Sequence, residues 1–172
     1  MSDKRLYRFS WDLLGDLEKG RPNLGNQTRV EVYRLLQFTF RDIIEQKFGT
    51  EAADKIFFDA GHLAGQSLYE QMLSQYSDFY EFVKELQNIC EELKIGVLRF
   101  EQTDLEHKIF ILTVSEDLDC SGLPELDYEV CKYDEGFFSG ILEKFFKVKF
   151  AVKEIDCWCT GDRTCRFKAN PA

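Results

Sequence analysis

The sequence has few helix-breaking residues and no long apolar run. Its 172 residues include 3 prolines, Pro22, Pro124 and Pro171, and no stretch rich in Gly, Pro or Ser that would mark a linker. We therefore expect one domain over residues 1–172. No apolar run approaches the roughly 20 residues that span a bilayer, and the first residues lack the apolar stretch and cleavage site of a signal peptide. These absences predict a soluble, cytoplasmic protein without a membrane span.

Positive charge is also scarce. Lys and Arg number 22 against 31 Asp and Glu, so the formal net charge is −9. Such a surface repels phosphate backbones and anionic membranes, which argues against a nucleic-acid partner. The sequence contains neither GxxxxGK[ST] nor a GxGxxG after a strand, so no nucleotide cofactor is indicated. An enzyme is thus not favoured, although a reductase that uses a separate electron donor stays open.

Aromatic side chains are abundant, with 16 Phe against 2 Trp, and they predict an aromatic interior that is either core or pocket. Helical spacing of apolar residues predicts three helices, the first capped by Asn26 and the third by Ser77 or Asp78. The second helix carries an apolar stripe interpreted as core, in which Ile56 and Leu63 take part. β-branched and aromatic runs follow, then a loop, another helix and two strands around a turn. The predicted ranges are 27–49, 51–76, 77–96, 97–104, 108–116, 117–127, 128–146, 147–159, 160–164 and 165–169. This order predicts an α+β domain in which N-terminal helices pack on an antiparallel sheet.

The stretch EIDCWCTGDRTCRF, residues 154–167, concentrates cysteines near the end of the chain. In a reducing compartment, clustered thiols bind metal or do chemistry more often than they form disulfides. Cys157 and Cys165 flank a turn, so a hairpin would bring their thiolates together. Cys159 would share a face with Cys157 on a regular strand, whereas Glu154 would point away unless the strand bulges or ends between them. Spacing alone leaves metal binding, ordinary buried thiols and redox chemistry open.

The C-terminal pattern resembles the 4-vinyl reductase domain family. The residues that carry the resemblance are Glu154, Cys157, Gly161, Cys165 and Phe167. The likeness extends upstream through 131–146, 55–68 and 20–36. The family includes the sensor domains of phenol- and xylene-responsive activators, and it implies a fold shared with Bet3-like transport subunits and haem-nitric-oxide-binding domains. In that fold, helices pack on an antiparallel sheet around an apolar pocket.

The resemblance also implies a structural zinc ion. Its ligands would be Cys131, Glu154, Cys157 and Cys165, in a zinc-binding portion that covers about 131–168. Four protein ligands leave no open position for water, so the ion would clamp a helix to the terminal hairpin. Cys159 would then be a spare thiol or a donor beside the site.

A second row of residues runs along the second predicted helix at helical spacing and could line a pocket. Two glycines in this row each cost about 1 kcal/mol relative to Ala, which asks for the close approach of a helix or of a ligand. The candidate pocket residues are Phe58, Gly61, His62, Gly65, Tyr69, Phe100, Phe110, Phe138, Ile141 and Phe145. His62 or Tyr69 would orient the ligand, although packed core is the competing interpretation. Neither tryptophan matches the one that grips phenol in the phenol sensors, so a larger, less polar hydrocarbon or lipid is expected.

Three functions follow from these observations. The first is a free-standing sensor or carrier domain that binds a small hydrophobic molecule and signals as a homodimer or through a partner protein. The second is an accessory role in reduction of a tetrapyrrole vinyl group, as the family name suggests. The third is an assembly subunit of the Bet3-like type. The first predicted helix is the natural surface for a homodimer.

Overall fold

The structure is a computed structural model that describes residues 5–172, and its helices and strands follow the predicted order. Two short turns of helix precede the main elements. The bounds are η1 Trp11–Leu14, α1 Leu17–Gly20, α2 Val30–Phe48, α3 Thr50–Leu68, η2 Tyr69–Leu73, α4 Phe79–Glu92, β1 Val97–Asp104, β2 Ile109–Ser115, α5 Lys132–Phe146, β3 Phe150–Asp156, η3 Trp158–Thr160 and β4 Cys165–Pro171. Asp78 caps α4 as predicted, because its side chain accepts hydrogen bonds from the main-chain N–H groups of Tyr80 and Glu81.

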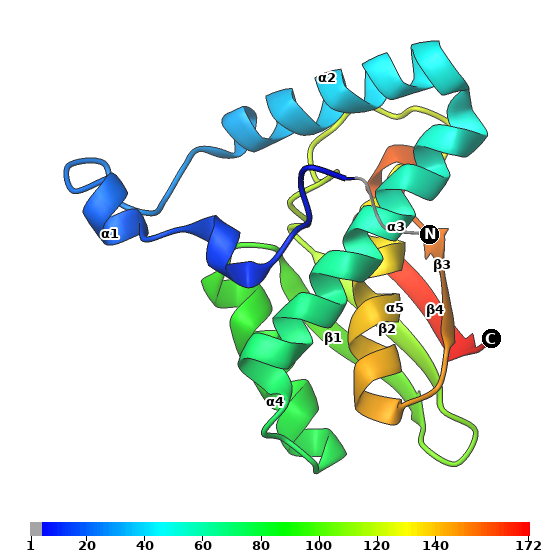
Figure 1. Ribbon diagram of the computed structural model, residues 1–172. Helices are drawn as coiled ribbons and strands as arrows, with labels where there is room; N and C mark the ends of the chain where they lie inside the picture. The colour runs from blue at the N-terminus through cyan, green and yellow to red at the C-terminus, as the bar shows by residue number, and fades with distance from the viewer. Residues whose placement is uncertain (1–4) are drawn as a thin grey trace.

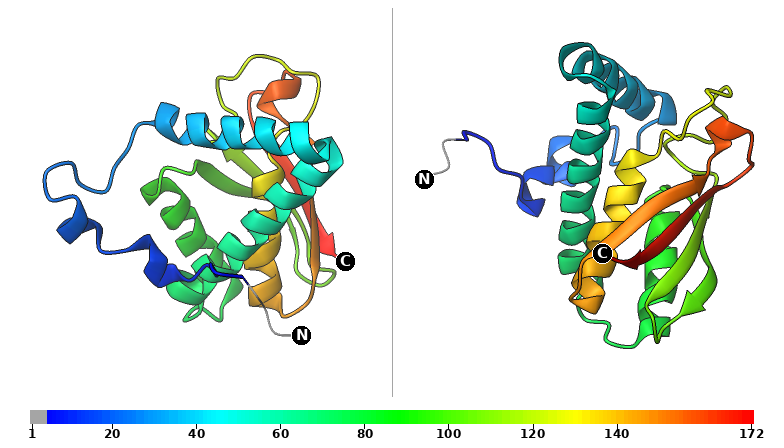
Figure 2. Two further views of the ribbon diagram at one scale, coloured as in Figure 1. Left: turned by 45° about the horizontal axis from the view of Figure 1, so that its top comes forward. Right: turned by 90° about the vertical axis from the view of Figure 1, so that its right-hand side faces the viewer.

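The four strands form one antiparallel sheet in the order β1-β2-β4-β3. The register shifts between Glu154 and Asp156 of β3, which bends the strand shortly before it ends. Helix α5 packs against the sheet and α3 packs against α5, so that α3, α5 and the sheet form successive layers (Figures 1 and 2). Helix α4 covers β1. This arrangement places the start of α5 beside the ends of β3 and β4.

Four glycines bring α3 and α5 into backbone contact. A Cβ atom added to Gly61 would lie 2.0 Å from the main-chain oxygen of Tyr133, and one added to Gly65 would lie 2.1 Å from that of Phe137. Across the contact, Gly136 and Gly140 meet the α3 backbone in the same way. The two mid-helix glycines of α3 are therefore explained by the approach of a helix.

The same contact corrects the predicted core stripe of α3. Ile56 is 40% exposed and Leu63 46% exposed, because the buried row of α3 is the one that contains the glycines. A backbone contact selects small side chains, so the row with the largest apolar side chains turns outward. The stripe interpretation was wrong for these two positions.

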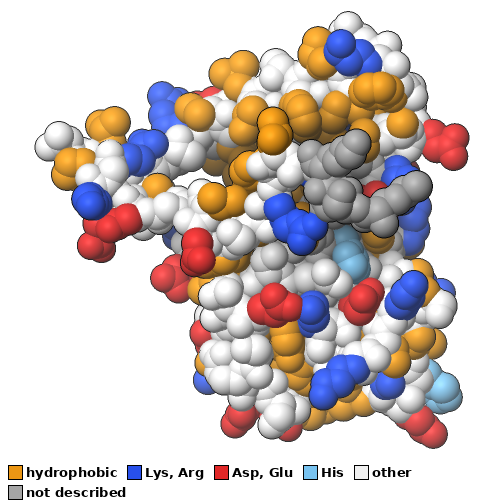
Figure 3. Space-filling model, viewed as in Figure 1, with side chains coloured by type: hydrophobic (Ala, Val, Ile, Leu, Met, Phe, Trp, Pro, Cys, Tyr) orange, Lys and Arg blue, Asp and Glu red, His pale blue; other side chains and the backbone are white. Residues whose placement is uncertain are grey.

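Helix α2 differs from its prediction in two ways. It begins at Val30 with Arg29 in the N-cap position, not at Asn26, because the backbone of Arg29 is still extended. Its apolar residues are also largely exposed, with Leu36 at 71% and Phe40 at 55%. Figure 3 shows hydrophobic side chains gathered along this helix. None of the described helices combines the length and the hydropathy that a bilayer crossing requires.

Phenylalanine rings fill the space between α4, the sheet and the C-terminal end of α5. Their centroids lie close together, for example 4.1 Å between Phe82 and Phe145 and 5.4 Å between Phe110 and Phe146. We call this set the aromatic cluster. Its members are Phe79, Phe82, Phe100, Phe110, Phe145, Phe146 and Phe150.

Candidate metal centre

Four cysteine sulfurs converge at one end of the sheet. Cys120 comes from the loop between β2 and α5, Cys131 precedes α5, Cys157 follows β3, and Cys165 begins β4. All four residues are fully buried, and their Sγ atoms all lie within 4.8 Å of one another. We call them the cysteine cluster. It joins four segments that are far apart in the sequence.

The sulfur spacing suits a single tetrahedral ion. A zinc–sulfur bond of about 2.3 Å gives a tetrahedron whose edge is about 3.8 Å. The Sγ atom of Cys131 lies 3.9 Å from that of Cys157 and 3.8 Å from that of Cys165, which matches this edge. The Sγ atoms of Cys120 and Cys165 are closer, at 3.0 Å. A tetrahedral set of four sulfurs is typical of zinc or of iron–sulfur sites.

Local structure explains how Cys157 and Cys165 meet. Strand β3 ends at Asp156, and the chain then forms the 3₁₀ turn η3, in which the N–H of Cys157 donates to Oγ1 of Thr160. Gly161 follows with φ of 98°, a conformation that favours glycine. Cys159 lies inside this turn, so it does not share a strand face with Cys157. Cys159 is buried but stands outside the set of four sulfurs that lie together.

Glu154 lies beside the cysteine cluster. Its side chain is buried, and its Oε2 accepts a hydrogen bond of 3.3 Å from the N–H of Cys131. Its Oε1 is buried without a hydrogen-bond partner among residues 5–172. Burial raises the pKa of Glu154 to about 9, and the nearby Cys157 adds to the shift. An unpartnered carboxylate oxygen at this point makes Glu154 the competitor of Cys120 for the fourth position around an ion.

The thiols perturb one another strongly. Hydrogen bonds from Cys120, Cys131 and Cys165 lower the pKa of Cys157, whereas the pKa of Cys131 is raised, chiefly by Cys120. One thiolate is thus stabilised by thiols that keep their protons. A divalent ion would take the place of these protons, since thiolates are the form that binds metal.

Cys120 is the site residue that the sequence analysis missed. It lies in the segment 117–127, which was interpreted as plain loop. Asp117 Oδ1 accepts hydrogen bonds from the N–H groups of Asp119 and Cys120, which forms a tight turn. The Asp-Leu-Asp-Cys sequence is a signal for such a turn, although it does not say that the turn reaches the distant hairpin.

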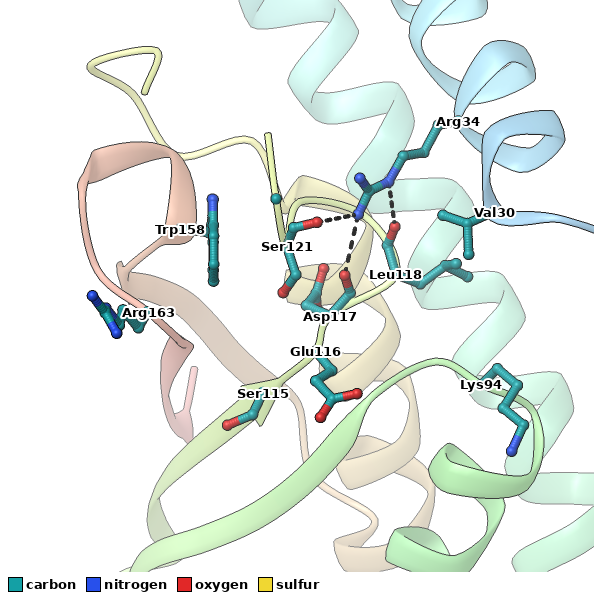
Figure 4. Close-up of a pocket in the computed structure, with 11 residues that line it drawn as sticks. Val30, Arg34, Lys94, Ser115, Glu116, Asp117, Leu118, Ser121, Trp158 and Arg163 are labelled. Atoms are coloured by element: carbon teal, nitrogen blue, oxygen red, sulfur yellow. Dashed lines mark hydrogen bonds between the residues drawn. The ribbon is translucent and has the colours of Figure 1, made fainter. Parts of the chain in front are cut away.

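Arg34 of α2 holds this loop in place. Its guanidinium donates hydrogen bonds to the main-chain oxygens of Leu118, at 2.8 Å, and Ser121, at 2.9 Å (Figure 4). A third contact, of 3.4 Å, reaches the main-chain oxygen of Asp117. The position of Cys120 therefore depends on α2 as well as on the loop.

The predicted pocket residues fall into two groups. Phe58, Gly61, His62 and Gly65 lie on α3 along its contact with α5, where His62 Nε2 is 3.2 Å from Glu143 Oε2. The other residues belong to or adjoin the aromatic cluster. They are Tyr69, Phe100, Phe110, Phe138, Ile141 and Phe145. The two groups do not line one common cavity wall, and their role in binding a ligand stays a prediction.

Three alanine or isosteric variants separate the two candidate ligand sets. If the four sulfurs bind the ion, Cys120→Ala lowers metal content to well below one ion per chain, while Glu154→Gln keeps it. If Glu154 is the ligand, the two results are exchanged. Cys159→Ala is the matched control, and it keeps its metal in both cases. Metal content is measured by inductively coupled plasma mass spectrometry on protein purified without chelator.

Comparison with known proteins confirms the predicted family resemblance, because residues 110–171 match the 4-vinyl reductase domain. An uncharacterized protein of Methanocaldococcus jannaschii is 28% identical over 145 residues, which are 84% of this chain and 79% of the relative. The phenol-responsive sensory domain of the transcription activator PoxR, solved with phenol, is similar with a TM-score of 0.64 and 14% identity, over 84% of this chain and 75% of that one.

Subunit 3 of a trafficking protein particle complex from Naegleria fowleri, covalently bound to palmitic acid, is similar with a TM-score of 0.63 and 10% identity, over 83% of this chain and 95% of that one. These two structural likenesses bear on the fold alone. They confirm the predicted α+β fold of the Bet3-like type, with helices packed on an antiparallel sheet.

Proposed function

We propose that this chain, whose residues 110–171 match the 4-vinyl reductase domain, is a small-molecule-binding domain held closed by a structural zinc ion. The observation that carries the proposal is the cysteine cluster, in which four buried sulfurs from four segments lie within 4.8 Å of one another. The PoxR domain, which shares the fold, was solved with phenol, and this supports small-molecule binding by the fold.

The zinc ion has a structural role in this proposal. We assign its four ligands to Cys120, Cys131, Cys157 and Cys165, with Glu154 as an acceptor beside them. All four are protein groups, so no position is left for a water or a substrate. The ion ties the loop after β2 and the start of α5 to the ends of β3 and β4. The reducing cytoplasm predicted from the cysteine content would keep these thiols available for metal.

The ligand in this proposal is a hydrocarbon or a lipid-like molecule, and it binds in the aromatic cluster. The cluster is apolar and extends from fully buried rings such as Phe82 and Phe110 to half-buried ones such as Phe100 and Phe145. A ligand would reach the interior by displacing the half-buried rings at the C-terminal end of α5. Bound palmitic acid in the similar trafficking subunit supports a lipid-like ligand.

Native mass spectrometry of protein purified without chelator tests both parts of the proposal. We expect one zinc ion per chain and, on organic extraction, a copurifying apolar molecule. Protein that has zinc but no apolar molecule should then bind a fluorescent fatty acid in a saturable manner. A chain that carries no metal at any stage of purification would contradict the clamp, and a failure to bind the fatty acid would contradict the ligand class.

A second candidate function, assembly as a homodimer, is favoured by the exposed apolar stripe of α2. Its residues are Val32, Leu35, Leu36, Phe40 and Ile43, which are 47–71% exposed. Side chains of this size supply several hundred Å² of apolar surface, which approaches the roughly 800 Å² per partner of a stable interface. The stripe runs along one helix, so two copies of α2 can pair antiparallel about a two-fold axis. We assign a second copy of this chain as the occupant of this face.

Replacing Leu36 with glutamate is expected to convert the dimer into a monomer. The carboxylate would face its own symmetry-related copy in the centre of an apolar interface, where an unpaired charge is costly. The measurement is size-exclusion chromatography with light scattering, with Glu92→Gln outside the stripe as the control. A wild-type chain that is monomeric at high micromolar concentration would contradict this interface.

A further inference from the structure

A second cavity, separate from the aromatic cluster, lies between α2, the start of α5 and the loop that follows β2. Its volume is about 170 Å³. Three aromatic residues line it, Tyr33, Tyr133 and Phe137, together with two acidic ones, Asp119 and Asp134. Leu118 and Ile95 complete an otherwise apolar wall. The cavity thus combines aromatic rings with carboxylates.

The two carboxylates differ in their hydrogen bonding. Asp119 is saturated, since one oxygen accepts from the hydroxyl of Tyr33 and the other from Nε2 of Gln37, both at 2.7 Å. Asp134 is only 5% exposed, and its Oδ2 has no hydrogen-bond partner within the described part of the chain. A buried carboxylate oxygen without a partner is costly and points to a donor that binds there.

The nearby cation does not supply that donor. Arg34 directs its N–H groups to main-chain oxygens of residues 117, 118 and 121, as Figure 4 shows. Asp117 adds a third buried acid behind Asp134, because ligand atoms of Asp117, Asp134 and Cys131 lie within 4.8 Å of one another. The surroundings of the cavity are therefore acidic, and they favour a cationic guest.

We propose that this cavity binds a small organic ammonium ion, whose nitrogen donates to Asp134 and whose carbons pack against Tyr33, Tyr133 and Phe137. Aromatic faces attract ammonium groups, and the attraction grows when water is excluded. A cavity of about 150 Å³ holds one benzene ring, so the guest is about the size of a single ring or smaller. This inference goes beyond the proposed function, because the site lies apart from the aromatic cluster and its guest is charged.

An inorganic cation fits the cavity less well. Calcium and magnesium ions take six or more oxygen ligands, including waters and several carboxylates. Here the lining is largely apolar, and Asp119 already accepts two hydrogen bonds. Asp134 is the carboxylate with a free oxygen, so the lining offers an ion too few ligands.

Isothermal titration with benzylamine, benzyl alcohol and benzoate tests the proposal at pH 7. At this pH benzylamine is the ammonium ion, while the other two are a neutral and an anionic analogue of similar size. We expect saturable binding of benzylammonium and at least tenfold weaker binding of both analogues. Equal binding of benzyl alcohol would overturn the proposal. So would displacement of benzylammonium by magnesium or calcium ions at lower concentration than benzylammonium itself requires.

Variants of the chain locate the site. Asp134→Asn keeps the shape of the side chain and removes its charge, so benzylammonium affinity should fall at least tenfold. The control, Asp59→Asn, removes an exposed acid of α3 and should bind as the wild type does. Unchanged affinity in Asp134→Asn would overturn the assignment.

A second pair of variants tests the role of the aromatic ring. Tyr133→Phe keeps the ring and should bind benzylammonium normally, whereas Tyr133→Leu removes it and should bind several-fold more weakly. Equal affinity in the two variants would show that the ring makes no contribution and would overturn this part. Metal content and fatty-acid binding, measured on the same samples, report on the proposed function separately and show that each variant is folded.

Discussion

Replacing Cys165 with alanine is expected to abolish stoichiometric metal binding and to lower the melting temperature by about 6–20 °C. Cys165 lies closest to the other sulfurs, 3.0 Å from Cys120 and 3.8 Å from Cys131, and it begins β4, which pairs with both β2 and β3. Loss of one partner from a buried charged site costs roughly 3–5 kcal/mol. Each kcal/mol corresponds to roughly 2–4 °C in a chain of this size, and metal binding is coupled to folding.

Cys90→Ala is the matched control for this variant. Cys90 is equally buried but lies in α4, away from the cysteine cluster. Its loss should cost about 1 kcal/mol as a small cavity and should leave metal content unchanged. Differential scanning calorimetry with metal analysis measures both quantities. Should Cys165→Ala retain one ion per chain and melt like Cys90→Ala, the four-sulfur site is wrong.

Replacing Gly136 with alanine is expected to cost more than about 4 kcal/mol, the range that marks a severe packing defect. The added Cβ would lie 2.0 Å from the main-chain oxygen of Phe58 and 2.8 Å from the main-chain nitrogen of His62. Both are backbone atoms, so no side-chain rotation relieves the clash, and α3 and α5 must move apart. We expect this variant to be insoluble or to melt far below the wild type.

Gly20→Ala provides the control for the glycine contact. Gly20 has nothing within 4 Å of an added Cβ, and its backbone needs no left-handed conformation. Alanine there should leave the free energy of unfolding within about 0.5 kcal/mol of the wild type, as surface substitutions usually do. Chemical denaturation of both variants makes the comparison, and a normal stability of Gly136→Ala would contradict the backbone contact.

The order of elements could be predicted from the sequence because most elements carry strong local signals. Helix α4 has an Asp cap and a clean apolar period, and β1 and β2 are dense in β-branched and aromatic residues. The start of α2 could not be placed, since Asn26 is a good cap by type but the chain stays extended through Arg29. Such a choice depends on tertiary contacts such as that of Arg34 with the loop.

Periodicity also fails to say what an apolar stripe faces. The stripe of α2 has helical spacing, yet Leu36 and Phe40 are exposed, and the row of α3 that is buried is the one with glycines. The burial of the glycine row follows from the approach of α3 and α5, which involves residues more than 70 positions apart. A pattern within one helix contains no information on that approach.

The candidate site was predictable in part for a related reason. Cys157 and Cys165 share a hairpin, so a local turn brings them together, and the family resemblance supplied Cys131. Cys120 has no local partner and is brought to the cluster by a turn and by Arg34. Glu154 was expected on the opposite strand face unless the strand bulged or ended, and the register shift in β3 is such an irregularity.

X-ray absorption at the zinc edge, on protein purified without chelator, tests the central claim most directly. The account predicts one zinc ion per chain, surrounded by four sulfur atoms at about 2.3 Å. A shell of three sulfurs and one oxygen would replace Cys120 with Glu154 as the fourth ligand, and a chain that holds no metal would contradict the clamp altogether.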